Sequence, residues 1–340
     1  MSDSIETRRR STRLSKGSLR RIIDKAIGHY GLVIVVIVIV AIFSALRPDT
    51  YMTASNLLSI ATAQSVTALL ALAIIGVLVV GEFDLSFTTV FGIVQVLVIG
   101  FMTEGGMAWP VACLIGLAVG VTTGIANTIL TIGLNVSSFV ATLGMSTILG
   151  GIAVGYSGGT ILTGNLSPTF SALAQLAPLS IEMPIWYVLV VAGFLYVLLE
   201  FTATGRHMRA VGGNRAAAEL AGISVWRATL VAFVIAGLIS ALAAIISGSQ
   251  LGSGQAVIAA GYLLPAYAAA FLGATTITPG RFNVWGTLVG VYLLGAGVAG
   301  LQQLGFAPWV QDLFNGAVLL LAVTVSRFMT RVRAGEAAGR

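Results

Sequence analysis

The chain is built around ten apolar segments separated by short polar or turn-forming clusters. They run roughly over residues 29–46, 57–80, 85–103, 109–132, 136–157, 184–202, 228–249, 263–277, 284–304 and 309–326. A membrane-spanning helix needs about 20 predominantly apolar residues, and the segments are close to that length. The pattern therefore predicts an all-α polytopic membrane protein with about ten transmembrane helices. Eight crossings are the alternative if 85–103 or 263–277 is re-entrant.

Composition excludes the soluble classes of protein. Only 9% of the 340 residues are charged, and 57% are apolar or aromatic. Soluble domains carry about 25% charged residues, so a soluble enzyme is excluded. Cys113 is the only cysteine, which excludes a disulfide scaffold.

The basic residues predict the orientation of the chain in the membrane. Basic residues concentrate in cytoplasmic segments. With ten crossings and a cytoplasmic N-terminus, the inside segments are 1–28, 203–227, 278–283 and 327–340. They hold eight, four, one and four Lys or Arg residues, which is 17 of the 18 in the chain, with Arg47 as the exception. Both termini are therefore predicted to be cytoplasmic.

The same arrangement divides the chain into three parts. Residues 1–28 and 327–340 are predicted to be basic cytosolic tails, and 29–326 form the transmembrane domain. The net charge of +6 belongs to the two tails. Basic tails beside a membrane favour contact with anionic lipid, so nucleic acid is not expected as a partner.

Residues 57–157 and 228–326 each contain four apolar segments. The two regions are offset by five segments, so they would cross the membrane in opposite senses. This arrangement is typical of the inverted repeats of transporters.

Residues 81–86, Gly-Glu-Phe-Asp-Leu-Ser, place two carboxylates between two long apolar segments. A charged side chain at the bilayer centre costs about 2.5–3.5 kcal/mol on insertion scales. Two interpretations stay open. Glu82 and Asp84 lie in a wetted turn at the interface, or the segment is a broken helix facing a translocation pathway. There the carboxylates would bind sugar hydroxyls or brace backbone amides.

The inside loop 203–227 predicts a short helix. Asn214 is a good N-cap, residues 215–221 are strong helix formers, and Gly222 suits a left-handed position after the helix. Two turns of helix are too short to be stable alone, so this helix needs a surface to pack on. A solvated connector is the alternative.

Two further features have more than one interpretation. The outside loop 158–183 either docks a partner or covers the membrane surface with a short helix. Glu200 is expected at the interface beside the basic cluster 206–209, and a proton-relay role is the alternative.

Motifs for catalysis are missing from the sequence. There is no G-x-x-x-x-G-K-[ST] phosphate loop, and His29 and His207 are too far apart to indicate a metal pair. We therefore expect no enzyme activity, no catalytic residues, no metal site and no cofactor in this chain.

Three stretches carry a resemblance over about residues 30–328. Residues 81–86 are similar to a G-G-I-D-L-S-V-G signature, and 138–145 to a P-F-I-A-T-L-G-T stretch. Residues 204–223 are similar to the segment T-x-x-G-R-x-x-x-A-x-G-x-N-x-x-A-A-x-x-x-G-I. These motifs belong to the permease subunits of ribose-type ABC sugar importers, the second carbohydrate-uptake class, which the chain resembles.

The resemblance implies a permease subunit in the bacterial inner membrane. It would translocate a monosaccharide or sugar alcohol, delivered by a periplasmic sugar-binding protein, by alternating access. A second permease chain, identical or different, would complete the channel. A separate ATP-binding ABC subunit would use ATP and Mg. The loop 158–183 would then be periplasmic, and 203–227 would be the coupling loop.

The resemblance also assigns residues to two sites. The translocation-pathway candidates are Glu82, Phe83, Asp84, Ser86, Phe139, Thr142, Thr275 and Thr276. The candidates for coupling to the ATPase are Gly205, Arg206, Gly212, Asn214, Ala217, Ala218 and Gly222.

The chain departs from the family pattern near the expected pathway. Glu82 stands where the family has a second Gly, and Phe87-Thr88 replace Val-Gly. The stretch 263–280 lacks the usual Glu and contains Pro265. These changes make a polyol as reasonable a substrate as a pentose. The alternative function is an ion-coupled secondary transporter working alone, with Asp84, Glu82 and Glu200 as its acids. A membrane scaffold that transports nothing is a third possible function.

Overall fold

The computed structural model describes residues 37–320 and 324, so most of the two predicted tails lies outside the described residues. The longer helices are Ile37–Leu46, α2 (Ala54–Ala63), α3 (Ser65–Val79), α4 (Phe87–Thr103), α5 (Trp109–Thr128), α6 (Ser138–Ser157), α8 (Met183–Phe201), α11 (Val225–Leu251), α12 (Leu263–Gly273), α13 (Val284–Gln303) and 309–320. The shorter ones are α7 (Pro168–Gln175), α9 (Ala203–Gly213) and α10 (Arg215–Leu220). Each of the ten apolar segments contains a helix, which confirms the all-α class.

Not every predicted crossing is one long helix. Five helices are long and apolar enough to span a membrane, and α2 with α3 makes a sixth if this pair, bent by 46°, is one span. α4 and the stretch 257–273 are shorter. The count of ten crossings, the orientation and the inverted repeat stay predictions.

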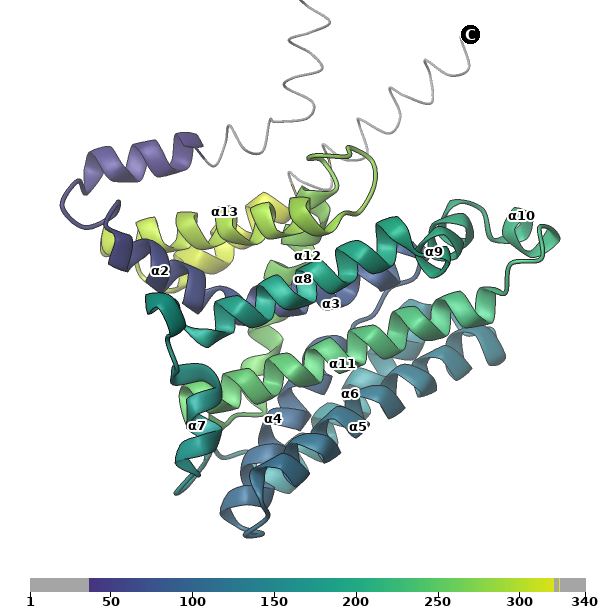
Figure 1. Ribbon diagram of the computed structural model, residues 1–340, viewed down its shortest axis with the longest axis horizontal. Helices are drawn as coiled ribbons and strands as arrows, with labels where there is room; N and C mark the ends of the chain where they lie inside the picture. The colour runs from purple at the N-terminus through teal and green to yellow at the C-terminus, as the bar shows by residue number, and fades with distance from the viewer. Residues whose placement is uncertain (1–36, 321–323, 325–340) are drawn as a thin grey trace, which may run out of the picture.

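The connections between helices gather at two ends of the protein. One end, called the α10 end, holds 81–86, 133–137, 202–224 and 274–283. The other, called the α7 end, holds 47–53, 104–108, 158–182, 252–256 and 304–308. In chain order the connections alternate strictly between the two ends (Figure 1), as successive membrane crossings would require.

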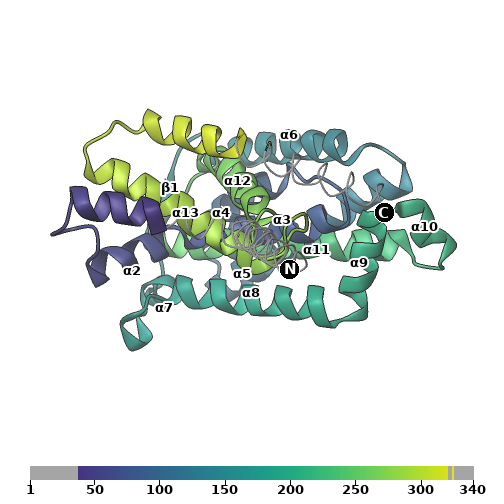
Figure 2. The same ribbon diagram turned by 90° about the horizontal axis from the view of Figure 1, so that it is seen from above.

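Helix α3 lies at the centre of the bundle. Fourteen of its 15 residues are buried. A helix that is apolar on all sides is stable only when other helices surround it. α3 contacts α8, α11, α12 and α13, and α6 and α8 lie on opposite sides of the bundle (Figure 2).

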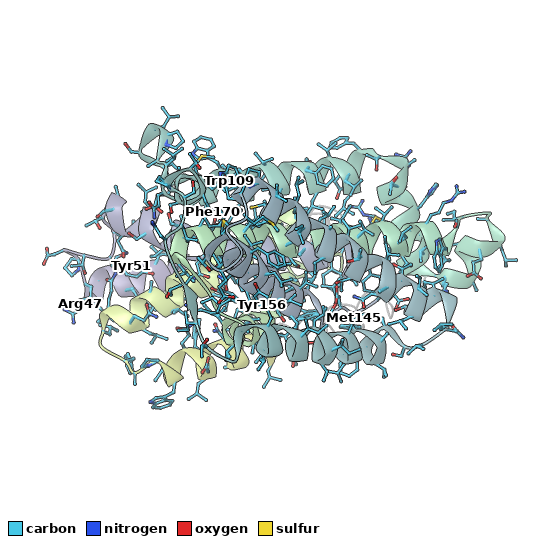
Figure 3. All side chains as sticks on the ribbon, turned by 90° about the horizontal axis from the view of Figure 1, so that it is seen from below. Arg47, Tyr51, Trp109, Met145, Tyr156 and Phe170 are labelled. Atoms are coloured by element: carbon cyan, nitrogen blue, oxygen red, sulfur yellow. The ribbon has the colours of Figure 1, made fainter. Side chains whose placement is uncertain are left out.

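The loop 158–182 folds against the end of α11. Its strand β1 (Leu162–Thr163) pairs with β2 (Ser253–Gly254) in antiparallel register. The Ser249 hydroxyl of α11 donates to the Phe170 carbonyl at 2.7 Å. Figure 3 shows Phe170 of α7 beside Trp109, and their ring centroids are 6.5 Å apart. The short helix expected in this loop is α7.

Glycines bring α5 and α11 into backbone contact. A Cβ on Gly237 would overlap the carbonyl oxygen of Gly120, and a Cβ on Gly124 would lie 2.7 Å from the carbonyl carbon of Phe233. Close approach at small residues is typical of helix packing in membranes. The Gly116-x-x-x-Gly120-x-x-x-Gly124 pattern therefore serves helix packing.

We predict that Gly237→Ala destabilises the protein. Alanine favours a helix over glycine by about 0.5–1 kcal/mol. The added methyl group must displace the backbone at Gly120, and overpacking costs about 1–3 kcal/mol. The apparent melting temperature of the detergent-solubilised protein should fall.

Gly193→Ala in α8 is the control, because a Cβ there meets nothing within 4 Å. Its melting temperature should be unchanged or higher. Equal melting temperatures for the two variants would contradict the packing role of Gly237.

Candidate coupling and translocation site

The segment 81–86 begins where α3 ends in a left-handed turn. Gly81 has φ +86°, a conformation that favours glycine. The Glu82 amide donates to the Val77 carbonyl at 3.0 Å, and the Gly81 amide donates to the Leu78 carbonyl at 3.2 Å. This Schellman arrangement satisfies the last carbonyls of α3.

The next three backbone amides have no helical partner, and side chains from other helices accept their hydrogen bonds. The acceptors are Ser138 Oγ for Phe83 at 3.1 Å, Tyr267 Oη for Asp84 at 3.2 Å and Thr142 Oγ1 for Leu85 at 3.0 Å. Tyr267 Oη also donates to the Asp84 carbonyl at 2.7 Å. Irregular backbone survives in apolar surroundings only with such partners. Helices α6 and α12 therefore hold this break in place.

Asp84 is buried and bonds within its own turn. The residue is 3% exposed, and Oδ1 accepts from the Ser86 amide at 2.8 Å and from Ser86 Oγ at 2.6 Å. Asn127 of α5 donates to Ser86 Oγ at 2.8 Å. Asp84 therefore braces backbone amides, as one interpretation of 81–86 expected, although the segment is a buried turn between the two successive helices α3 and α4.

Glu82 differs from Asp84 because it points toward the loop 203–227, the predicted coupling loop. Its carboxylate is 3.9 Å from Nη1 of Arg215, the first residue of α10. The backbones also meet here, since a Cβ on Gly81 would lie 3.5 Å from Gly212 Cα. A Cβ on Gly212 would overlap the Val79 carbonyl oxygen. The break at 81–86 and the coupling loop are therefore in direct contact.

The coupling loop contains two helices, of which only α10 was predicted from the sequence. α9 begins at the N-cap Thr202, whose side chain accepts from the Gly205 amide at 3.1 Å. Three glycines in α9 argue against a helix by propensity. Two of them are required by packing, since a Cβ on Gly205 would overlap carbonyl oxygens of α8 and one on Gly212 would overlap Val79.

Helix α10 has the caps that the sequence predicts. Asn214 Oδ1 accepts from the Ala217 amide at 3.0 Å. Gly222 has φ +79°, and the Ile223 amide donates to the Ala218 carbonyl at 3.0 Å. These interactions confirm the N-cap and the left-handed glycine.

Most of α10 is open to the surroundings. Ala218 is buried, whereas Asn214, Ala217 and Gly222 are exposed. Leu220 is 91% exposed and is the most exposed of the large hydrophobic residues that the structure describes. Leu220 is not among the coupling candidates predicted from the sequence, although an apolar residue in a polar loop was the available signal.

A second ion pair lies at the α10 end. Arg209 of α9 donates two hydrogen bonds to the carboxylate of Glu200 at the end of α8. Nη1 donates to Oε2 at 2.9 Å, and Nη2 donates to Oε1. Glu200 thus lies beside the basic cluster, as expected. Arg206 is exposed on the same helix, α9.

The remaining pathway candidates do not form one group. Thr142 is buried and binds the break, whereas Phe139, on the same helix α6, is 50% exposed. Thr275 bonds the Leu272 carbonyl locally at 2.7 Å, and the buried Thr276 hydroxyl has no partner. No described hydrogen bond joins Thr275 or Thr276 to 81–86.

A second break lies before α12. The Gln255 amide donates to Gln95 Oε1 of α4 at 3.2 Å, and Gln95 Nε2 donates to Ser247 Oγ at 2.9 Å. Gln95 is fully buried. At 1.5 Å per residue it lies about 12 Å along α4 from Thr103. The stretch 252–262 thus enters the bundle, and α12 then continues the chain to the α10 end.

Comparison with known proteins decides the class of the chain. The family model described as "Branched-chain amino acid transport system / permease component" matches residues 56–323. The chain belongs to this permease family.

Several relatives of this permease are named for the import or transport of sugars. The ribose import permease protein RbsC of Escherichia coli K12 is 32% identical over 298 residues, which cover 86% of this chain and 91% of the relative. RbsC of Bacillus subtilis 168 is 32% identical over 291 residues, 85% of this chain and 90% of the relative. The D-allose transport system permease protein AlsC of E. coli K12 is 28% identical over 302 residues, which cover 89% of this chain and 92% of the relative.

These matches make the chain a multi-pass membrane protein of the sugar ABC permease type, which confirms the resemblance seen in its motifs. No solved structure was found to match the chain.

We predict that Asp84→Asn separates folding from transport. Asparagine keeps a carbonyl oxygen for the Ser86 amide, so the yield of folded permease should change little. The carboxylate charge is lost, and we expect the transport rate to fall more than the yield. Monodisperse yield in size-exclusion chromatography and solute uptake measure the two effects.

Asp84→Ala is the companion variant. It leaves the buried Ser86 amide without an acceptor, which costs about 1–3 kcal/mol. Its yield should drop below that of Asp84→Asn. Equal loss of yield and transport in Asp84→Asn would show that the carboxylate serves only the turn.

Proposed function

We propose that the chain is the transmembrane permease subunit of an ATP-driven importer in the bacterial inner membrane. It translocates a monosaccharide or sugar alcohol that a periplasmic binding protein delivers at the α7 end. A separate ATPase subunit binds the α10 end, and a second permease chain, identical or paralogous, completes the pathway.

The observation that carries this proposal is the exposed helix α10. A six-residue helix is not stable alone. Here it is capped at both ends, anchored through Ala218, and leaves Leu220 uncovered. An exposed leucine on a pre-formed helix suits insertion into an apolar groove of a partner protein. The sugar-import permeases among the relatives make an ATPase subunit the expected partner.

A chain of contacts leads from α10 into the membrane domain. Arg215 reaches Glu82, and the amides of Phe83 and Leu85 are held by Ser138 and Thr142 of α6. A displacement of α10 would therefore be passed to 81–86 and then to α6. Helix α6 also carries Phe139 on its exposed face. ATP-driven closure of the ATPase pair would select one of two permease arrangements by differential binding.

We predict that Leu220→Asp abolishes ATP-driven uptake. A charged side chain cannot enter an apolar groove without losing its hydration. Permease and ATPase are co-purified, reconstituted with the binding protein in proteoliposomes, and tested for ATP-dependent uptake of D-ribose, D-allose and ribitol. Leu220→Asp should fail to retain the ATPase.

Leu179→Asp is the matched control, because Leu179 is 83% exposed at the opposite, α7 end. It should retain the ATPase. Retention of the ATPase by Leu220→Asp would contradict the docking role of α10. Uptake driven by a proton or sodium gradient without ATP would replace the proposal with an ion-coupled secondary transporter.

We predict that Glu82→Gln loosens the coupling of ATP hydrolysis to transport. Exposed ion pairs contribute up to about 1 kcal/mol, which corresponds to about a fivefold effect at most. The number of ATP molecules hydrolysed per sugar imported should rise. The charge-reversed double variant Glu82→Arg with Arg215→Glu should return this number toward that of the unaltered complex.

Glu219→Gln is the control. Glu219 is the other carboxylate beside Arg215, 3.6 Å from Nε, and it lies within α10. This variant removes the other negative charge beside Arg215 and leaves the segment 81–86 unaltered. If Glu82→Gln and Glu219→Gln change the number of ATP molecules hydrolysed per sugar equally, the contact between α10 and 81–86 does not couple ATP hydrolysis to transport.

A further inference from the structure

A pocket at the α7 end is lined by carboxamide side chains. It has a volume of about 440 Å³ and lies between α2, α13 and the start of the helix 309–320. Five carboxamides line it: Asn56, Gln64, Gln302, Gln303 and Gln311. The chain has eight glutamines, and four of them are in this pocket. None of the described residues that line it is charged.

Only part of the hydrogen-bonding capacity of these amides is used inside the protein. Gln303 Nε2 donates to Asn56 Oδ1 at 2.8 Å, and Gln302 Nε2 donates to Gln311 Oε1 at 3.3 Å. Among the described contacts, the carbonyl of Gln302, the amino group of Gln311 and both ends of Gln64 have no hydrogen-bond partner. The pocket therefore offers both donors and acceptors.

The backbone is shaped to place Gln64 in this pocket. Gln64 lies at the bend of 46° between α2 and α3. Its side chain packs on Gly295 of α13, where a Cβ would overlap Gln64 Cγ. The bend and the glycine together bring a polar side chain against α13.

The loop before α2 is fixed beside the pocket. The Tyr51 hydroxyl donates to the Ala296 carbonyl at 2.8 Å, and Asn56 Nδ2 donates to the Tyr51 carbonyl at 2.6 Å. A neighbouring hollow of about 600 Å³ shares Asn56, Ser59 and Gln303. Arg47 lines this hollow, and Figure 3 shows Arg47 and Tyr51 together at this end. Asp49 lines this hollow too, and neither charged residue lines the carboxamide pocket.

The chemistry of the lining selects a class of ligand. A carboxamide both donates and accepts hydrogen bonds, as a hydroxyl group does. Without a charged residue the pocket gives an ion no advantage over a neutral solute. Ile60 and Val298 add apolar contact for carbon–hydrogen faces. The volume lies within the range of about 300–1,000 Å³ that small-molecule sites occupy.

We infer that this pocket is an entry site of the permease, where a neutral polyhydroxylated solute binds before it crosses the membrane. The direction of transport in this inference rests on the proposed function. The site itself is a property of the pocket and can be measured without transport.

The test measures equilibrium binding to the permease–ATPase complex in nanodiscs, without the binding protein. The probes are radiolabelled D-ribose, D-allose and ribitol. The double variant Gln302→Leu with Gln311→Leu removes both partners of one solvent-exposed hydrogen bond, so neither amide is left without its partner and the fold should be preserved. We expect the affinity for the bound probe to fall by about tenfold or more, the effect of losing about 1.4 kcal/mol.

Gln175→Leu is the matched control, because Gln175 is an exposed glutamine of α7 outside the pocket. It should bind as the unaltered complex does. Equal binding by the double variant and the unaltered complex would overturn the inference, and so would the absence of binding for all three probes.

Uptake measured in parallel separates this inference from the proposed function. If the double variant loses binding but ATP drives no uptake by the unaltered complex, the proposed function fails and the site stands. If ATP-driven uptake occurs with the same KM in the double variant, the site fails and the proposed function stands.

Discussion

Every backbone N–H inside an apolar bundle needs an acceptor, and the break at 81–86 depends on this requirement. α3 cannot continue past Gly81, so three consecutive amides lose their helical partners. Side chains of α6 and α12 accept their hydrogen bonds. Since an unsatisfied amide in such surroundings costs several kcal/mol, the break and the two helices behave as one unit.

This unit lies against the coupling loop because glycines permit backbone contact. Gly81 and Gly212 bring the end of α3 to the end of α9. A larger residue at position 212 would push α9 away and separate Arg215 from Glu82. The glycines that disfavour α9 by propensity are thus the residues that place it, and packing outweighs propensity here.

The two ends of the protein differ in chemistry. Ion pairs gather at the α10 end, where Glu82, Glu200, Arg209 and Arg215 are partly exposed. Neutral carboxamides gather at the α7 end, between α2 and α13. This division fits an α10 end that binds a protein partner and an α7 end that receives a neutral solute.

Local interactions made parts of the site predictable from sequence. The caps of α10 follow from Asn214 and Gly222, because a cap bonds residues only three to five positions away. The same reasoning could not separate Glu82 from Asp84. They are two residues apart and alike in chemistry, yet one faces Arg215 and the other is buried against Ser86. That difference depends on which distant helices surround the turn.

The sequence by itself determined the helical membrane class, the positions of the apolar segments and the family, because these depend on the hydrophobicity of continuous stretches and on ordered motifs. Only the tertiary structure decided that α9 is a helix, that Glu82 meets Arg215, and that four of the eight glutamines share one pocket. Gln64 and Gln302 are far apart in the chain. Their proximity comes from the packing of α2 on α13, which no local pattern encodes.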